Sequence, residues 1–302
     1  TALRGQTNGS VAVALHPDRI RNKEGPMRHT LRLQLRQQRG LGARGDGEAD
    51  TPGGVVYVPF TLPGEAANVA VDSHKGSVMS LLVPSPDRIA PACRHFESCG
   101  GCSLQHWHRE PMLEWKRQLV IDALAKRGID AAVQPTIGSG PGERRRVTLS
   151  VRSEHGRVQT GFNAAHSHDI VEISECPVAS PALVSAFPVM RELARQLKVT
   201  RDGGHITLTQ TDTGLDVSFS GFEKLDDAVR RKLSEFALRK NFARLSVGTD
   251  VIVELIKPSV DFGGVTVSPP PGGFLQASAY VETAMADLVT GHISKAKKTA
   301  DL

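Results

Sequence analysis

Four cysteines are the residues of this chain whose type and spacing could do chemistry. Three of them, Cys93, Cys99 and Cys102, form a C-x5-C-x2-C run, and the fourth, Cys176, lies beside Pro177 farther along the chain. Thiols converge in this way either to bind a soft metal ion or cluster as thiolates, or to form disulfides. If all four bind a metal, no thiol of this chain remains as a catalytic nucleophile.

The spacing of the cysteines favours an iron–sulfur cluster over zinc. Zinc ribbons usually pair two short knuckles, whereas this chain has one, between Cys99 and Cys102. Three ligands on one loop and a distant fourth are typical of iron–sulfur proteins, and Gly100 and Gly101 would let backbone N–H groups approach the sulfurs. We therefore predict a 4Fe–4S cluster, with a four-cysteine zinc site or four unrelated buried thiols as alternatives. The nearby histidines are expected at the surface or around the ligands: His95, His106 and His108.

The composition is that of a soluble globular protein. The chain has 302 residues, of which 39% are hydrophobic and 23% charged, and this length allows two or three domains. No stretch approaches about 18 consecutive apolar residues, and the apolar run over residues 11–15 is too short for a signal peptide. We therefore predict a cytoplasmic protein without a membrane segment. Thiols stay reduced in the cytoplasm, which favours metal binding over disulfides.

The net charge of +5 is concentrated near the start of the chain. Residues 1–46 carry nine Lys and Arg against three Asp and Glu. A basic arm of this kind suits a polyanion such as nucleic acid. A solvated, partly disordered tail is the simpler explanation, so the arm alone does not decide the partner.

Short strands follow this basic arm. Polar and apolar residues alternate over residues 31–35, which is the period of a half-buried strand. A glycine-rich turn over 40–47 and short strands over 55–60 and 68–71 come next, before a stiff Pro-rich linker over 84–88. Strands at this spacing predict a small β-barrel.

The cysteine run is followed by helices and strands in mixed order. Apolar residues lie on one face of a predicted helix over 109–128, where Trp115 is expected in the core rather than as a base-stacking platform. Residues 269–273, rich in Pro and Gly, are expected to form a hinge before a last helix that carries Val281 and Leu288. Between these two helices the pattern predicts strands over 146–151, 159–162, 170–173, 206–209, 215–219 and 251–256, the last of them buried, and helices over 183–197 and 225–238.

Motifs spread over most of the chain after residue 40 carry a resemblance to a known family. They lie at residues 41–47, 58–60, 62–65, 93–106, 115–117, 161–162, 167–168, 176–177 and 274–276. With these motifs the sequence resembles the iron–sulfur-containing, S-adenosylmethionine-dependent RNA uracil-5-methyltransferases. The resemblance implies that the target is RNA, and ribosomal RNA rather than transfer RNA. The protein is expected to be a monomer.

The resemblance implies a multidomain α+β fold. An OB-like RNA-binding barrel of the TRAM type would be followed by a central α+β domain that bears the cluster, and then by the start of a Rossmann-like methyltransferase domain. The helix over 109–128 is expected to pack on that last domain. The expected boundaries are 1–30 for a flexible basic lead-in, 31–90 for the TRAM barrel, 91–268 for the central domain and 269–302 for the start of the methyltransferase domain.

The resemblance also implies roles for particular residues. Cys93, Cys99, Cys102 and Cys176 would bind the cluster, and Gln276 would lie against S-adenosylmethionine. The family usually has asparagine where Ser278 stands, which is a departure from its cofactor contact. The candidate phosphate contacts for RNA, each of which could equally be an ordinary surface arginine, are Arg44, Arg144, Arg145 and Arg146.

The chemistry that the resemblance implies needs a free thiolate. In the family a cysteine adds to C6 of a flipped-out uracil, C5 takes the methyl group, and a base removes the C5 proton. Asp301 and Leu302 resemble the first residues of the cofactor-binding glycine motif, so we expect a truncated enzyme that lacks a catalytic residue and is inactive alone. A stand-alone RNA-binding module with structural zinc is the alternative, and an electron carrier is disfavoured.

Overall fold

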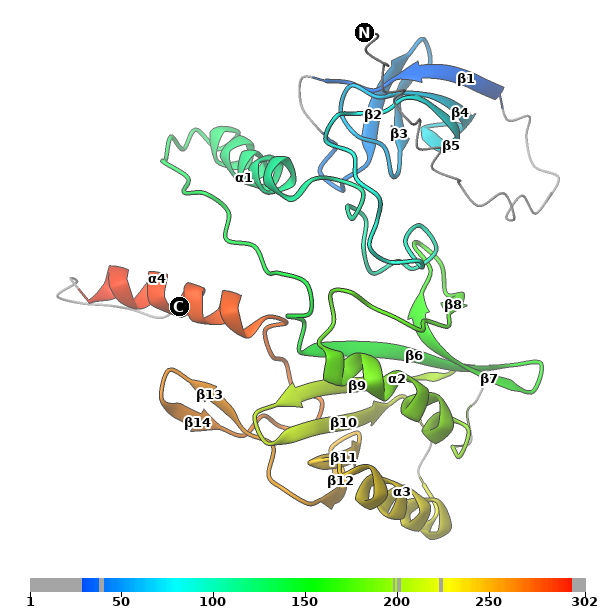
Figure 1. Ribbon diagram of the computed structural model, residues 1–302, viewed down its shortest axis with the longest axis vertical. Coiled ribbons are helices and arrows are strands. Elements are labelled where there is room, and N and C mark those ends of the chain that lie inside the picture. Colours follow the sequence, from blue (N-terminus) through cyan, green and yellow to red (C-terminus); the bar gives the residue numbers. More distant parts are fainter. Residues whose placement is uncertain (1–28, 38–40, 198, 200–201, 223–224, 295–302) are drawn as a thin grey trace, which may run out of the picture. The chain divides into compact units, whose positions relative to one another are not determined.

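The computed structural model describes residues 29–37, 41–197, 199, 202–222 and 225–294. The chain divides into two compact units (Figure 1). The first unit comprises Thr1–Pro91 and Ser103–Val133, and the second comprises Ala92–Cys102 and Gln134–Leu302. Most of the predicted lead-in over 1–30, and Asp301 and Leu302 of the expected glycine motif, lie outside the described residues.

The first unit contains a five-stranded sheet that forms a half-barrel. Its strand order is β1-β4-β5-β3-β2, and neighbouring strands are antiparallel except for β3 and β5. The core of this sheet consists of Leu33, Leu35, Ala49, Val56, Val58, Ala67 and Val69. The strands are β1 (His29–Gln34), β2 (Gly47–Thr51), β3 (Gly54–Val58), β4 (Ala66–Asp72) and β5 (Lys75–Val83).

This sheet confirms the three predicted strands and adds two more. The alternation over residues 31–35 corresponds to β1, and the other predicted runs correspond to β3 and β4. β2 was missed because its sequence, GEADT, has no apolar alternation, although Ala49 is fully buried. β5 begins after the turn at residues 73–74 and pairs with β4 along its length.

Helix α1 (Arg109–Ala125) belongs to the first unit. Near its start a small core forms from Leu41, Leu62 and Trp107, with Trp115 packed against it. The indole Nε1–H of Trp115 donates to the carbonyl of Leu41 at 3.2 Å. Trp115 is therefore a partly buried residue packed against this core, which bears out its core assignment in part, whereas the packing of this helix on a methyltransferase domain stays a prediction.

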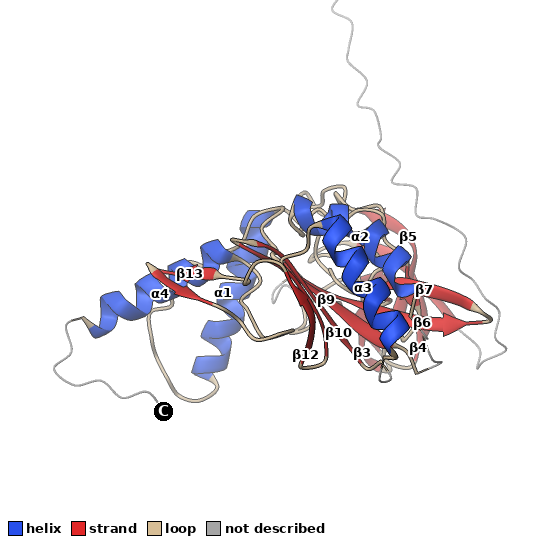
Figure 2. Ribbon diagram, turned by 90° about the horizontal axis from the view of Figure 1, so that it is seen from below, coloured by secondary structure: helices blue, strands red, loops and turns tan. Residues whose placement is uncertain are grey.

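The second unit is built on a seven-stranded mixed sheet of order β12-β11-β10-β9-β6-β7-β8. Helices α2 (Pro181–Ala194) and α3 (Asp227–Lys240) pack on one face of it and share a single core with it (Figure 2). Alternate residues of β6, Val147, Leu149 and Val151, are buried in that core. The strands are β6 (Arg146–Glu154), β7 (Arg157–Asn163), β8 (Ile170–Val171), β9 (Gly204–Thr211), β10 (Gly214–Ser220), β11 (Arg244–Val247) and β12 (Asp250–Glu254).

One strand of this sheet differs from its prediction. The run over 251–256 was expected to be a buried strand, but β12 is an edge strand, and Val251 and Ile256 are 41% and 51% exposed. The buried strand is its neighbour β11, which includes Arg244 and Ser246. The prediction of a buried strand over 251–256 was therefore wrong. The buried strand, β11, has four residues that include an arginine and a serine, so it has no apolar run by which it could be predicted.

The last described elements carry exposed apolar side chains. Strands β13 (Val260–Phe262) and β14 (Val265–Val267) form a hairpin, and α4 (Ala279–Ile293) confirms the predicted last helix. None of the described residues of α4 is buried. The large exposed apolar residues here are Phe262, Val265, Val267, Phe274, Tyr280, Met285, Leu288, Val289 and Ile293.

The fold class is mixed α+β, as predicted, with helices on one face of the larger sheet. The identification of the half-barrel with a TRAM domain, and the domain boundaries, stay predictions. None of the helices in the part of the chain that the structure describes has both the length and the apolar character needed to cross a bilayer.

Candidate metal centre

The cysteine loop lies in the second unit with Cys176, so all four predicted ligands belong to the same unit. The loop turns tightly, because the N–H of Cys99 donates to the carbonyl of His95 at 2.8 Å. Its far end pairs with the end of β7, where the N–H of Gly100 donates to the carbonyl of Asn163 at 2.9 Å. A Cβ at Gly100 would come within 2.9 Å of that carbonyl oxygen, so glycine is required for this close approach.

The near end of the loop is bound to the residues that precede Cys176. The backbone N–H of Arg94 donates to Glu175 Oε1 at 2.8 Å, and Arg94 Nε pairs with Glu175 Oε2 at 3.0 Å. The N–H of Ser174 donates to His95 Nε2 at 3.1 Å, and the Ser174 hydroxyl lies 3.2 Å from the same nitrogen. These contacts hold the segment that carries Cys93 beside the segment that carries Cys176.

The four thiols are half-buried, and within the described part of the chain they form no disulfide. Burial raises the pKa of Cys99, and Cys102, Cys176 and Cys93 raise this pKa further, while the N–H of Gly101 opposes the shift. Burial likewise raises the pKa of the Cys93 thiol. The four groups therefore lie within electrostatic reach of one another, and metal binding here would release protons.

The donors match a soft metal in type, but they are not assembled around one point. Among the described residues, no group of three or more His, Cys, Asp or Glu side chains could hold a metal ion. The chemistry nevertheless fits a thiolate-bound cluster, since four thiols share one unit and Gly101 donates its N–H to Cys99 Sγ at 3.4 Å. The ligand assignment and the choice between a 4Fe–4S cluster and zinc stay predictions.

The three histidines near the loop differ in position. His95 bonds to Ser174 beside the ligands, and His108 is exposed, which agrees with the expectation for both. The expectation is wrong for His106, because this residue belongs to the first unit and is 1% exposed. Burial, aided by the charge of Arg88, lowers the pKa of His106 to about 4.

The arginines proposed as RNA contacts divide into two pairs. Arg44 is exposed on the turn before β2, and Arg144 is exposed just before β6. Arg145 is engaged within the protein, where its Nη2 pairs with Glu282 at 2.5 Å and its Nε donates to the Gln276 carbonyl at 3.1 Å. Arg146 donates to a carbonyl of the 269–273 loop. Contact with RNA therefore stays a prediction for the two exposed arginines, Arg44 and Arg144.

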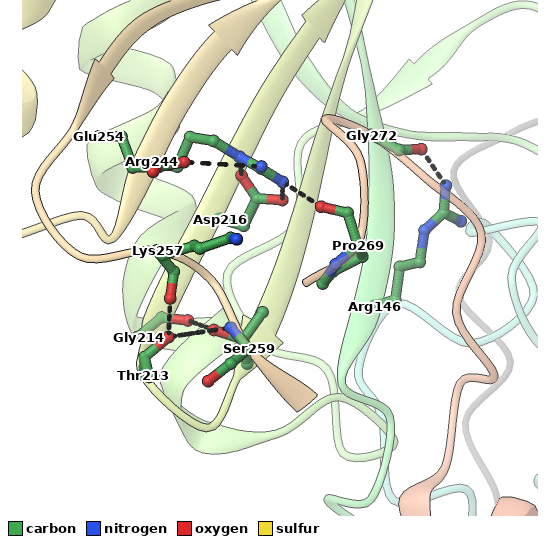
Figure 3. Close-up of polar contacts among 11 residues, drawn as sticks. Arg146, Thr213, Gly214, Asp216, Arg244, Glu254, Lys257, Ser259, Pro269 and Gly272 are labelled. Atoms are coloured by element: carbon green, nitrogen blue, oxygen red, sulfur yellow. Dashed lines mark hydrogen bonds and ion pairs between the residues drawn. The ribbon is translucent and has the colours of Figure 1, made fainter. Parts of the chain in front are cut away.

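A buried ion pair that the sequence did not reveal anchors this loop to the sheet (Figure 3). Arg244 Nε and Nη2 bond to the two carboxylate oxygens of Asp216 at 2.9 and 2.8 Å, with side chains 5% and 4% exposed. Arg244 also donates to the Pro269 carbonyl at 2.9 Å, and Arg146 donates to the Gly272 carbonyl at 3.3 Å. The predicted hinge is thus tied to β6 and β11.

Gln276, the predicted cofactor contact, lies between this anchored loop and α4. Its side chain is half-buried, and its backbone carbonyl is held by Arg145. Ser278 is the N-cap of α4, since its Oγ accepts from the N–H of Val281 at 3.2 Å and donates to Glu143 at 3.0 Å. Asparagine is an equally good N-cap, so the departure at Ser278 keeps the helix start intact. The contact of Gln276 with S-adenosylmethionine stays a prediction.

No family model matches the chain. An uncharacterized RNA methyltransferase of Brucella suis is 48% identical over 264 residues, which are 87% of this chain and 64% of that protein. One of Rhizobium meliloti is 45% identical over 269 residues, 87% of this chain and 65% of the relative. A 23S rRNA (uracil(1939)-C(5))-methyltransferase of Shewanella woodyi is 31% identical over 271 residues, 84% and 60% of the two chains. The chain therefore spans less than two thirds of the length of each of these relatives.

Proposed function

We propose that this chain is the RNA-binding and cluster-binding part of an RNA methyltransferase that uses S-adenosylmethionine to modify C5 of a uracil, in ribosomal RNA. The observation that carries the proposal is the 48% identity to an RNA methyltransferase over 87% of the chain, a stretch that includes residues of both units. The uracil-5 chemistry is supported by the relative named as a 23S rRNA uracil-C5 methyltransferase and by the motifs around the cysteines.

In this proposal the four cysteines hold a 4Fe–4S cluster. The cluster when bound supplies a rigid link between the loop over 92–102 and the segment at Cys176. The chain's own part is to bring the two segments together through Arg94, His95 and Gly100, and to direct the backbone N–H of Gly101 at Cys99 Sγ.

RNA binding is proposed for the half-barrel and for the start of β6. Arg44 and Arg144 present exposed guanidinium groups, which suit phosphate oxygens. Arg145 has a different part, because it fixes the backbone of Gln276 and pairs with α4, so we propose that it positions the residue that would lie against the cofactor.

Methyl transfer by this mechanism requires a cysteine thiolate that adds to uracil. The chain has four cysteines, and the proposal uses all of them as cluster ligands. We therefore propose that the chain by itself binds RNA but transfers no methyl group from S-adenosylmethionine. Incorporation of labelled methyl groups into RNA by the purified chain would contradict this assignment.

Anaerobic purification of the chain tests the cluster. About four irons and four sulfides for each chain, with a brown colour, are expected. One zinc with no iron or sulfide would favour a stand-alone RNA-binding module with structural zinc. RNA affinity that falls steeply with salt is expected in either case, and its absence in a filter-binding assay would contradict RNA binding altogether.

A further inference from the structure

We propose that Arg94, His95, Ser174 and Glu175 form a latch that docks the cysteine loop beside Cys176 before any metal is bound, and that this latch sets the affinity of the site for its metal. The inference rests on the proposed metal site, and it concerns residues that are not themselves ligands. The latch joins residues 79 and 81 positions apart in the sequence.

In one half of the latch, the carboxylate of Glu175 accepts from two donors of Arg94. Glu175 Oε1 accepts from the backbone N–H of Arg94 at 2.8 Å, and Glu175 Oε2 accepts from Arg94 Nε at 3.0 Å. The backbone bond fixes the main chain next to Cys93, while the acceptor residue is bonded covalently to Cys176. The first and fourth ligands are thus brought together by their immediate neighbours.

The other half of the latch is His95. Ser174 N–H can only donate, so His95 Nε2 is the acceptor of the 3.1 Å bond, and the ring proton belongs on Nδ1. His95 also accepts at its carbonyl from the N–H of Cys99 at 2.8 Å. Its side chain therefore connects the tight turn that carries Cys99 to the segment that carries Cys176.

The latch acts on metal affinity because it lowers the entropy lost on binding. Bringing together ligands separated by a long stretch of chain costs conformational entropy, which a metal would otherwise have to offset on binding. With the latch closed, and with Gly100 bonded to Asn163 at the other end of the loop, part of that cost is met before the four thiols converge on a metal. A pre-docked loop binds its metal more tightly than a free one.

The latch can be removed without unfolding the unit. The Arg94 and Glu175 side chains are 71% and 32% exposed, and exposed ion pairs contribute little to global stability. A matched control exists in the same unit, where Arg157 Nη2 pairs with Glu172 at 2.8 Å and the side chains are 72% and 30% exposed. This second pair lies outside the cysteine loop.

The test uses the full 302-residue chain with Glu175→Ala, Glu175→Gln, His95→Phe and the control Glu172→Ala. Cobalt(II) serves as the probe, because its thiolate charge-transfer absorption reports a thiolate site whether the resident metal is iron or zinc. Roughly tenfold weaker cobalt binding is expected for Glu175→Ala and His95→Phe, since residues that position metal ligands typically have effects of this size. Glu175→Gln, which keeps one acceptor oxygen, should be intermediate, and Glu172→Ala should bind as the wild type does.

Hydrogen exchange on the metal-free chain supplies a second readout. The amides of Arg94 and Ser174 should be protected in the wild type and in Glu172→Ala, and should lose protection in Glu175→Ala and His95→Phe respectively. Fast exchange of both amides in the metal-free wild type, or wild-type cobalt affinity in both latch variants, would overturn the latch alone. A wild-type chain that takes up neither cobalt nor iron and sulfide would overturn the proposed metal site, and the latch with it.

Discussion

Acidification should destabilise the first unit through one buried histidine. His106 is 1% exposed, and its ring lies edge-on to Phe60 with the centroids 6.3 Å apart. Burial is the main cause that lowers the pKa of His106 from 6.5 to about 4, and the charge of Arg88 adds to it, while Glu65 opposes it. The folded protein therefore keeps this imidazole neutral where the unfolded chain would protonate it.

The magnitude follows from the difference between the two pKa values. Between pH 6.5 and 4 the unfolded state binds a proton that the folded state does not, so stability falls as the pH falls through this window. Each pH unit in the window corresponds to about 1.4 kcal/mol, which gives a loss of about 2 kcal/mol at pH 5 and a limit of about 3 kcal/mol. Above pH 6.5 the contribution of His106 is fully present and constant.

Tryptophan fluorescence during urea unfolding measures this effect selectively. The chain has two tryptophans, and both, Trp107 and Trp115, lie in the first unit. The wild type should lose about 2 kcal/mol more than His106→Phe between pH 7 and pH 5, because phenylalanine has no proton to bind. His108→Phe, at an exposed histidine two positions away, controls for the loss of a histidine ring.

Two results would refute this reasoning. Parallel loss of stability with falling pH in the wild type and in His106→Phe would mean that protonation of His106 is not resisted by the fold. A nuclear magnetic resonance titration that finds the His106 pKa near its ordinary value of 6.5 would contradict the burial argument directly.

Three further predictions concern the ion pair, the ligands and RNA. Asp216→Ala removes the carboxylate that accepts two hydrogen bonds from the buried Arg244 and should cost about 3–5 kcal/mol of stability, measured by hydrogen exchange of the β10 and β11 amides. A cost below about 1 kcal/mol would contradict the role of the pair. Cys176→Ser should abolish retention of iron and sulfide on anaerobic gel filtration, and an unchanged iron content would remove Cys176 from the ligand set. Arg44→Ala should weaken RNA binding and reduce the slope of log affinity against log salt by about 1, whereas Arg157→Ala, at another exposed arginine, should not.

Periodicity in the sequence identified the elements whose cores are apolar. The helix through Leu183 and Met190 corresponds to α2, where both side chains are fully buried, and the run ending at Phe219 corresponds to β10. A short element without an apolar run was not found. β11 is the example, because Arg244 is buried there with Asp216 as its ion-pair partner, and this partner lies on a neighbouring strand that no local pattern can indicate.

The candidate site divides in the same way. Cysteine spacing indicated which residues could act as ligands, since spacing is a local property. It could not indicate that Arg94 and His95 bond to Ser174 and Glu175, because those contacts depend on how β7 and β8 place the distant segment. Nor could it distinguish Arg145, which is paired with Glu282, from its exposed neighbour Arg144.

The order in which the chain visits the two units limits how such proteins can be recombined. The path leaves the first unit after Pro91, returns at Ser103 and leaves again after Val133. A genetic crossover near residue 90, which looks like a natural end for the half-barrel, would separate Leu41 and Leu62 from Trp107 and split their shared core. The half-barrel and the cysteine loop are therefore expected to be inherited together, and exchanging either of them alone between related proteins should disrupt this core.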